Sequence, residues 1–233
     1  MSDAPGESKS ADVGTGHRAR LRKRLAEGGP DALLDHELVE YLLALAIPRR
    51  DTKPLAKALI ARFGGFGALL TADWEELAQV KELGETSIAA LKIAQASALR
   101  LLKSEISERP VLSGWQALLD YLRADMAHLS VERVRVLHLN ARNMLLRDDH
   151  MGDGSVDEAA IYAREVVKRA VALGSTSLIL VHNHPSGSPE PSRQDIAITR
   201  QIIDATRPIG VTVHDHVIIG AQGHSSMRAL GLI

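Results

Sequence analysis

The segment from His182 to Asp195 reads HNHPSGSPEPSRQD and directly follows the apolar run LILV at 178–181. Such a run predicts a buried strand within a sheet, and α/β proteins commonly place ligand and catalytic groups where these strands end. In extended chain, residues two apart point the same way, so His182 and His184 can present both imidazoles to one metal ion. We therefore expect an α/β domain with a functional site at the end of this strand.

Asp195 is the third candidate ligand. Pro185, Pro189 and Pro191 constrain the loop after the histidines, and Ser192 opens a predicted helix that has Asp195 in its first turn. The helix dipole favours an ionised carboxylate there, which is the form that binds a metal. Two neutral imidazoles and one carboxylate leave a tetrahedral zinc ion one position for water, as in catalytic zinc sites. A capping box formed by Ser192 and Asp195 is the competing interpretation.

The full spacing H-x-H-x7-S-x2-D resembles the JAMM motif of MPN-domain metalloproteases. HNHPSG at 182–187 and PSRQD at 191–195 resemble the RadC family of bacterial proteins. The resemblance covers almost the whole chain, because it extends to HRARLRKRLAEGG at 17–29, IPRRDTKPLAKALI at 47–60 and DHVIIG at 215–220.

This resemblance implies an MPN (JAMM, cytidine-deaminase-like) fold with one zinc ion per chain. The metal ligands of the family correspond to His182, His184 and Asp195 in this sequence. A serine that steadies the tetrahedral oxyanion corresponds to Ser192. The family also has a glutamate that holds the attacking water and takes its proton.

Glu132, in the predicted strand VERVRVLHLN, matches that glutamate. Its side chain shares a face with Val134 and Val136, whereas Arg133 and Arg135 share the opposite face. A carboxyl group turned toward an apolar face has its pKa raised by desolvation, which suits proton transfer near neutral pH. The alternative is a frayed strand end with the carboxylate in water.

Two other groups compete for roles at the site. Glu165 is a rival for the glutamate, but it lies in a predicted helix whose solvated face explains it. A second H-x-H, His214-Asp215-His216, lies in the predicted last strand without a third ligand nearby. We expect it to have a structural role or to orient the site, through Asp215 or His216.

Composition and charge limit the other possibilities. The 233 residues contain no cysteine and have a formal net charge of −1, so thiolate chemistry and a global positive field for nucleic acid are both excluded. No leader peptide and no apolar run of membrane-spanning length is present, which favours a cytoplasmic protein without membrane contact.

Periodicity predicts two domains after a disordered, small-residue tail at 1–16. The first, at 17–107, is all-α and helix-hairpin-helix-like. The second, at 111–233, is the α/β MPN/JAMM domain, with a mixed sheet flanked by helices. Helices are expected at 35–47, 52–64, 66–70, 73–80, 86–103, 114–126, 162–173 and 192–206, and strands at 131–140, 143–148, 178–181 and 211–219.

The first domain raises the question of DNA binding. Residues 80–91 resemble a helix-hairpin-helix, but Glu82 replaces the first hairpin glycine and Glu85 adds a second negative charge where a phosphate would rest. Local basic clusters, which are more often solvated surface, are formed by Arg18, Arg20, Arg22, Lys23 and Arg24 and by Arg49, Arg50 and Lys53. DNA binding is therefore only weakly supported.

The sequence as a whole favours a zinc-dependent hydrolase that cleaves peptide or isopeptide bonds in a protein or peptide substrate. Glu132 would take the proton from water and Ser192 would stabilise the oxyanion. A DNA-repair-associated accessory protein with a non-catalytic metal site is the alternative, and a zinc nuclease is a third reading. Substrate identity, oligomeric state and the choice of zinc over iron or manganese stay open.

Overall fold

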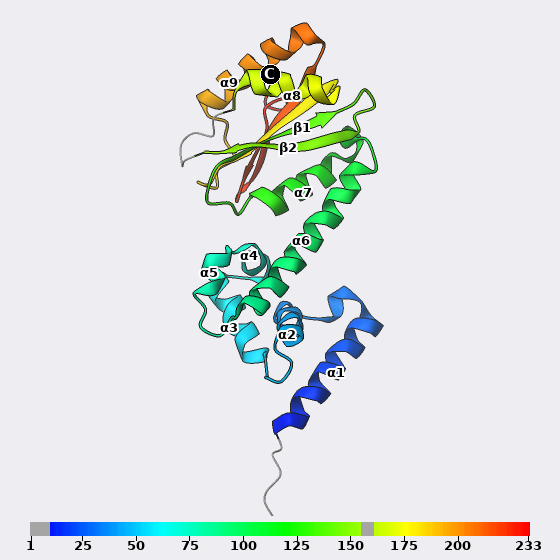
Figure 1. Cartoon of the computed structure of the whole chain (residues 1–233), viewed down its shortest axis with the longest axis vertical. Coiled ribbons are helices and arrows are strands. Elements are labelled where there is room, and N and C mark those ends of the chain that lie inside the picture. Colours follow the sequence, from blue (N-terminus) through cyan, green and yellow to red (C-terminus); the bar gives the residue numbers. More distant parts are fainter. Residues whose placement is uncertain (1–9, 155–160) are drawn as a thin grey trace, which may run out of the picture. The chain divides into compact units, whose positions relative to one another are not determined.

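A computed structural model of the chain describes residues 10–154 and 161–233, with side chains from residue 16 onward. The chain divides into two compact units, residues 1–97 and 98–233, and each has its own buried core (Figure 1). Among the described residues, no helix combines the length and the apolar character needed to cross a bilayer.

The first unit is helical, as predicted. Its core packs apolar side chains from successive amphipathic helices, among them Val39, Leu43, Leu59 and Leu91. The helices are α1 (Ser10–Gly28), α2 (Asp35–Ala46), α3 (Lys53–Phe63), α4 (Phe66–Thr71), α5 (Trp74–Ala78) and the first part of α6 (Glu85–Ser107), with a 3-10 turn η1 at Pro30–Ala32. Where a helix-hairpin-helix was expected, at residues 80–91, a short connection follows α5 at Ala78 and leads into α6 at Glu85.

The N-terminal end of this unit differs from expectation. Helix α1 begins at Ser10, inside the stretch 1–16 that was expected to be a disordered tail. Adding residues to an existing helix costs far less than nucleating one, so a helix formed over 17–28 can extend toward its N-terminus. Residues 1–9 of the expected tail lie outside the described residues.

The second unit is a three-layer α/β/α arrangement around one mixed sheet (Figure 1). Strand β1 is antiparallel to both β2 and β3, β3 is parallel to β4, and β4 is antiparallel to β5. The order across the sheet is β2-β1-β3-β4-β5. The strands are β1 (Arg133–Leu139), β2 (Leu145–Asp153), β3 (Ser177–Asn183), β4 (Thr212–Gly220) and β5 (Gly223–Ser226).

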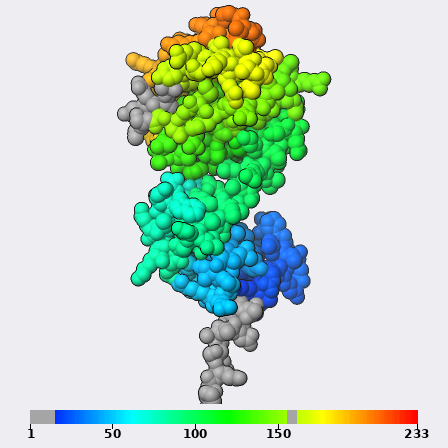
Figure 2. Space-filling model, in the orientation of Figure 1, coloured from blue at the N-terminus to red at the C-terminus, as the bar shows by residue number. Residues whose placement is uncertain are grey.

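Helices cover both faces of this sheet. On one face α8 (Ala163–Leu173) and α9 (Arg193–Thr206) pack on Val136, Leu178 and Leu180, and in the space-filling view their yellow and orange atoms form the outer surface there (Figure 2). On the other face α7 (Trp115–Met126), preceded by a 3-10 turn η2 at Val111–Gly114, packs on Ile179 and Val181. Every residue of β3 is buried, as its continuous apolar run predicts.

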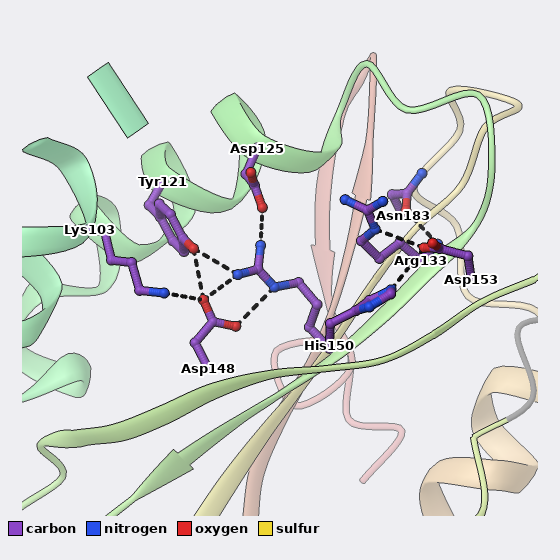
Figure 3. Close-up of polar contacts among 9 residues, drawn as sticks. Lys103, Tyr121, Asp125, Arg133, Asp148, His150, Asp153 and Asn183 are labelled. Carbon is purple, nitrogen blue, oxygen red and sulfur yellow. Dashed lines mark hydrogen bonds and ion pairs between the residues drawn. The ribbon is translucent and has the colours of Figure 1, made fainter. Parts of the chain in front are cut away.

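A network of charged side chains is buried between α7 and the sheet (Figure 3). Arg135 on β1 contacts both carboxylate oxygens of Asp148 on β2, and it also contacts Asp125 and the Tyr121 hydroxyl of α7. Lys103 on α6 lies 3.4 Å from Asp148. Arg135 is only 8% exposed, and these partners compensate its buried charge.

Candidate metal centre

The two histidines and the aspartate converge although they come from different elements. His182 lies near the end of β3, His184 follows that strand, and Asp195 lies in the first turn of α9. His182 Nε2 and His184 Nε2 are 2.9 Å apart, and Asp195 Oδ1 is 3.2 Å from His182 Nε2. Asp195 Oδ2 lies 3.5 Å from His184 Nε2. Each of the three residues therefore offers one ligand atom, and these three atoms lie within 4.8 Å of one another, close enough to share one metal ion.

The loop between these ligands is seated on the end of β4. Gly187, which has a φ of 87°, accepts a hydrogen bond through its carbonyl from Gln222 N. A Cβ added at Gly220 would lie 2.3 Å from Gly187 O, so only glycine allows the loop this close. The glycines thus bring the chain from β3 back toward α9.

Ser192 and Asp195 also form the capping box that competed with the metal reading. Asp195 N donates to Ser192 Oγ over 3.1 Å, and Ser192 N donates to Asp195 Oδ2 over 2.7 Å. Ser192 is the N-cap of α9 and is exposed. The two readings are compatible, because the capping geometry holds the Asp195 carboxylate while both of its oxygens face the histidines.

The proton positions on the histidines follow from their neighbours. His184 Nδ1 lies 2.9 Å from the Ser188 carbonyl oxygen, which can only accept, so this nitrogen carries the proton. A neutral His184 therefore presents the lone pair of Nε2 to the centre.

The same reasoning applies to His182 through two further residues. The Thr199 hydroxyl donates to the Asp195 carbonyl, so it accepts from His216 Nδ1, which is 2.6 Å away. A neutral His216 then accepts at Nε2 from His182 Nδ1 over 2.8 Å. His182 is left with its lone pair on Nε2, which points at the centre. This relay, formed by His182, His216, Thr199 and the Asp195 carbonyl, connects two of the three candidate ligands.

These residues fit a zinc ion. In the tautomers assigned above, two imidazole lone pairs and a carboxylate lie together, and either a proton or a metal cation between them must offset their mutual repulsion. Ligand atoms about 2.0–2.1 Å from a tetrahedral zinc ion lie roughly 3.3 Å apart, close to the separations found here. The donor set of two nitrogens and a carboxylate is also one that zinc prefers.

The pKa shifts favour the ionised form of Asp195 and the neutral form of His216. Burial raises the pKa of Asp195, but hydrogen bonds with His182 and His184 outweigh it and hold the pKa well below its ordinary value. Burial lowers the pKa of His216 far below its ordinary value, which keeps this ring neutral in the relay. The hydrogen bond with Asp195 raises the pKa of His184, so a metal ion would compete with a proton at that ring.

Glu132 lines the same pocket as two of the three candidate ligands, His182 and Asp195. It is half-buried, directly precedes β1 and shares the pocket wall with His182, Asp195 and His216. Its charge acts on His184. Val134 also lines this pocket, as the predicted shared face requires, whereas Arg135 lies on the α7 side. The apolar part of the wall includes Leu180, Ile198 and Ile202.

The rival residues lie elsewhere. Glu165 pairs with Arg164 and Lys168 on α8. His214 contacts Asn143 at the β1–β2 turn over 2.9 Å. Asp215 accepts from the Ser226 hydroxyl and from Arg228 N, so of the second H-x-H only His216 reaches the site.

Thr199 was not identified from the sequence. Its position one helical turn after Asp195 is the only sequence signal, and that spacing is common for threonines that bond their own helix. Its role depends on a contact with β4, which periodicity within α9 does not indicate.

Comparisons with known proteins agree with this architecture. Residues 112–232 match the family described as RadC-like JAB domain, and residues 15–89 match the family described as UPF0758 N-terminal. A UPF0758 protein of Ruegeria pomeroyi is 48% identical over 217 residues, which are 93% of this chain and 97% of that protein. A UPF0758 protein of Rhodobacter capsulatus is 49% identical over 213 residues, 91% of this chain and 100% of that protein.

The sheet, its helices and the matched region define the second unit as a domain of the JAB, or MPN, class with a JAMM-like fold. The N-terminal match and the full-length relatives carry the assignment to the whole chain. It belongs to the RadC-like UPF0758 family.

Proposed function

We propose that this protein is a zinc-dependent hydrolase that cleaves peptide or isopeptide bonds. The observation that supports this most directly is the convergence of His182, His184 and Asp195 at the pocket that Glu132 lines together with His182 and Asp195. His182, His184 and Asp195 would hold the metal. When bound, zinc lowers the pKa of water and polarises the substrate carbonyl.

The chain's own residues supply the remaining chemistry in this proposal. The Glu132 carboxylate accepts a proton from the attacking water and returns it to the leaving amine. Ser192 Oγ accepts from Asp195 N, and its hydroxyl proton, which hydrogen-bonds with the Asp195 carboxylate in the structure, would turn to donate to the oxyanion. The relay through His216 and Thr199 keeps the His182 proton on Nδ1, away from the metal.

The charges around the pocket favour an amide over a phosphodiester substrate. Its described lining residues include Glu132 and Asp195 but no lysine or arginine. A phosphodiester would bring its negative charge toward these carboxylates without a compensating cation other than the metal. A neutral amide meets no such repulsion.

The contacts of the basic clusters weaken the DNA-binding alternative. Arg18 donates to the carbonyls of Ile47 and Arg50, and Arg24 pairs with Glu37 over 2.7 Å. Arg50 pairs with Glu82 at the hairpin. These arginines stabilise the helical unit internally, so they are poorly placed to neutralise phosphates.

The proposal is tested by metal analysis of the purified protein and by cleavage of a peptide library, with and without chelator. Glu132→Gln should keep the bound zinc and lower turnover by about 100-fold or more. Glu165→Gln is the matched control and should keep full activity. Cleavage that persists after complete zinc removal, or in Glu132→Gln at the parent rate, would contradict the proposal.

A further inference from the structure

Asn183 lies between the two candidate histidine ligands, but its side chain contacts the other strand. Its Oδ1 accepts from Arg133 N over 2.8 Å, and its Nδ2 donates to Val131 O over 3.0 Å. These two backbone groups stand immediately after and before Glu132. Figure 3 shows Asn183 beside Arg133, next to Asp153 and His150.

The ladder between β1 and β3 explains why a side chain is needed here. Backbone pairing with β1 ends at Val134–His182. Beyond this pair the chain contacts β4, since Asn183 lies opposite Ile219 and His184 N donates to Ile219 O over 2.8 Å. Glu132 therefore lies outside the ladder. Continuing the antiparallel register would place it opposite His184, in agreement with the effect of its charge on that ring.

Glu132 is held from the β2 side as well. Gly154 N donates to Glu132 O over 2.8 Å, and Asp153 accepts from Arg133 Nε over the same distance. The Asn183 contacts tie the segment to the strand that ends in the candidate ligands, beyond the last backbone pair at Val134–His182. Their loss would loosen this connection and let the Glu132 backbone shift relative to His182 and His184.

We propose that Asn183 is a positioning residue for Glu132, whose carboxamide fixes the distance between the proton acceptor and the candidate metal ligands. This inference rests on the proposed function. An asparagine suits the task because it donates at one end and accepts at the other, which matches one carbonyl and one amide. Asn183 is 1% exposed and therefore shielded from water, so its carbonyl and amino groups depend on the protein for hydrogen-bond partners.

The first measurement does not depend on activity. In the parent protein, the Arg133 amide proton should exchange with solvent as slowly as amides inside β1. In Asn183→Ala its exchange should become about tenfold faster, as expected for one lost hydrogen bond. An Arg133 amide that is unprotected in the parent, or unchanged in Asn183→Ala, would overturn the inference even if the protein is a hydrolase.

Activity and metal affinity are then compared in the same variants. Asn183→Ala and Asn183→Asp should lower kcat by about 100-fold, with KM and the zinc Kd within about twofold of the parent. Asn183→Asp keeps the acceptor for Arg133 N but places an oxygen against Val131 O. A loss of zinc affinity equal to the loss of kcat would assign Asn183 to the ligand strand instead and overturn the inference.

Asn140 provides the matched control. Its carboxamide likewise makes two hydrogen bonds with the backbone, here with Oδ1 accepting from the amides of Arg142 and Met144 at the far end of β1. Asn140→Ala should lower the free energy of unfolding by a similar amount and leave kcat unchanged. If the parent protein hydrolyses no peptide at all, the proposed function fails, while the exchange measurement still tests Asn183.

Discussion

Thr199 has one hydroxyl proton and three groups within hydrogen-bond distance, namely the Asp195 carbonyl, His216 Nδ1 and the Met227 sulfur. Giving the proton to the carbonyl directs the whole relay, because His216 and then His182 must each donate in turn. With the opposite direction, His182 Nε2 would carry a proton toward the candidate metal. A single side chain thus selects the tautomer that can bind a cation.

Thr199→Val should therefore weaken zinc binding by about 10- to 100-fold, because the valine has nearly the same shape but accepts no proton from His216. Thr199→Ser retains the hydroxyl and should bind zinc within about threefold of the parent. Competition with a chromogenic chelator measures both affinities, and ¹⁵N NMR reports the His182 tautomer. Equal zinc affinity in the valine variant would show that the relay does not orient the ligand.

Substitution can separate the observed N-cap role of Ser192 from its proposed role as an oxyanion donor. Ser192→Ala removes the N-cap acceptor and should cost about 1 kcal/mol of unfolding free energy. Ser192→Asp restores a capping oxygen and should regain that stability. Neither variant has a proton to donate to the oxyanion, so both should lose about 100-fold in kcat on a cleavable peptide. If the aspartate variant regains activity along with stability, capping explains the residue.

At the scale of elements, the buried arginine network joins α7 to the β1–β2 hairpin. The Asp148 side chain is 0% exposed, and its charge is compensated by Arg135, Lys103 and the Tyr121 hydroxyl. Burial, followed by the nearby Asp148 charge, raises the pKa of Tyr121, so the phenol keeps its proton as a donor. The network is fully satisfied and therefore sensitive to the loss of one member.

Arg135→Met should destabilise the protein by about 3–5 kcal/mol, because it leaves a buried carboxylate without its main partner. Chemical denaturation followed by circular dichroism measures the change. Arg147→Met is the control, since Arg147 pairs with Asp149 at the surface and should cost less than about 1 kcal/mol. Replacing Asp148 by Asn in the Arg135→Met background should recover part of the loss, and an unchanged double variant would argue against this electrostatic cause.

The elements also show what sequence patterns can and cannot predict. Apolar periodicity predicted α2, α3, α8, α9 and β3 to within a few residues, because each element has one face or its full length in a core. Strand β5 was missed because GHSS at Gly223–Ser226 contains no apolar residue. The ligand triad followed from the spacing of one segment.

Interactions between elements were beyond prediction from local patterns. Thr199, Asn183 and the buried Arg135 depend on which residues face each other across strands, and register is set by the folded sheet. His216 was expected only to have a structural or orienting role, and its contact with His182 is consistent with that expectation.

For the whole molecule, buried histidines predict a loss of stability in mild acid. Burial lowers the pKa of His138 and of His214, so these rings stay neutral in the folded protein. Below about pH 6.5 the unfolded chain takes up protons there that the folded chain does not, so the unfolding free energy falls with pH. Below about pH 4 the loss continues, since hydrogen bonds from arginines lower the pKa values of Asp149 and Asp153.

His138→Gln tests the first part of this profile. The variant should lose a slope of at most about 1.4 kcal/mol per pH unit, one proton's contribution, between pH 7 and pH 5. Urea denaturation at several pH values measures it. Leu137→Ala, at a neighbouring buried position, should lower stability at every pH without changing the slope. Parallel curves for the parent and His138→Gln would rule out His138 as the source.

Helix α6 belongs to both cores, since Ile88 and Leu91 lie in the first and Ile106 lies in the second. A fragment that contains the JAB-class unit alone should therefore start at Ala98 and not after the end of α6. A fragment that begins after α6 would lack Ile106, which shares a buried cluster with Val111 and Leu118. The apolar surface exposed in this way would favour aggregation.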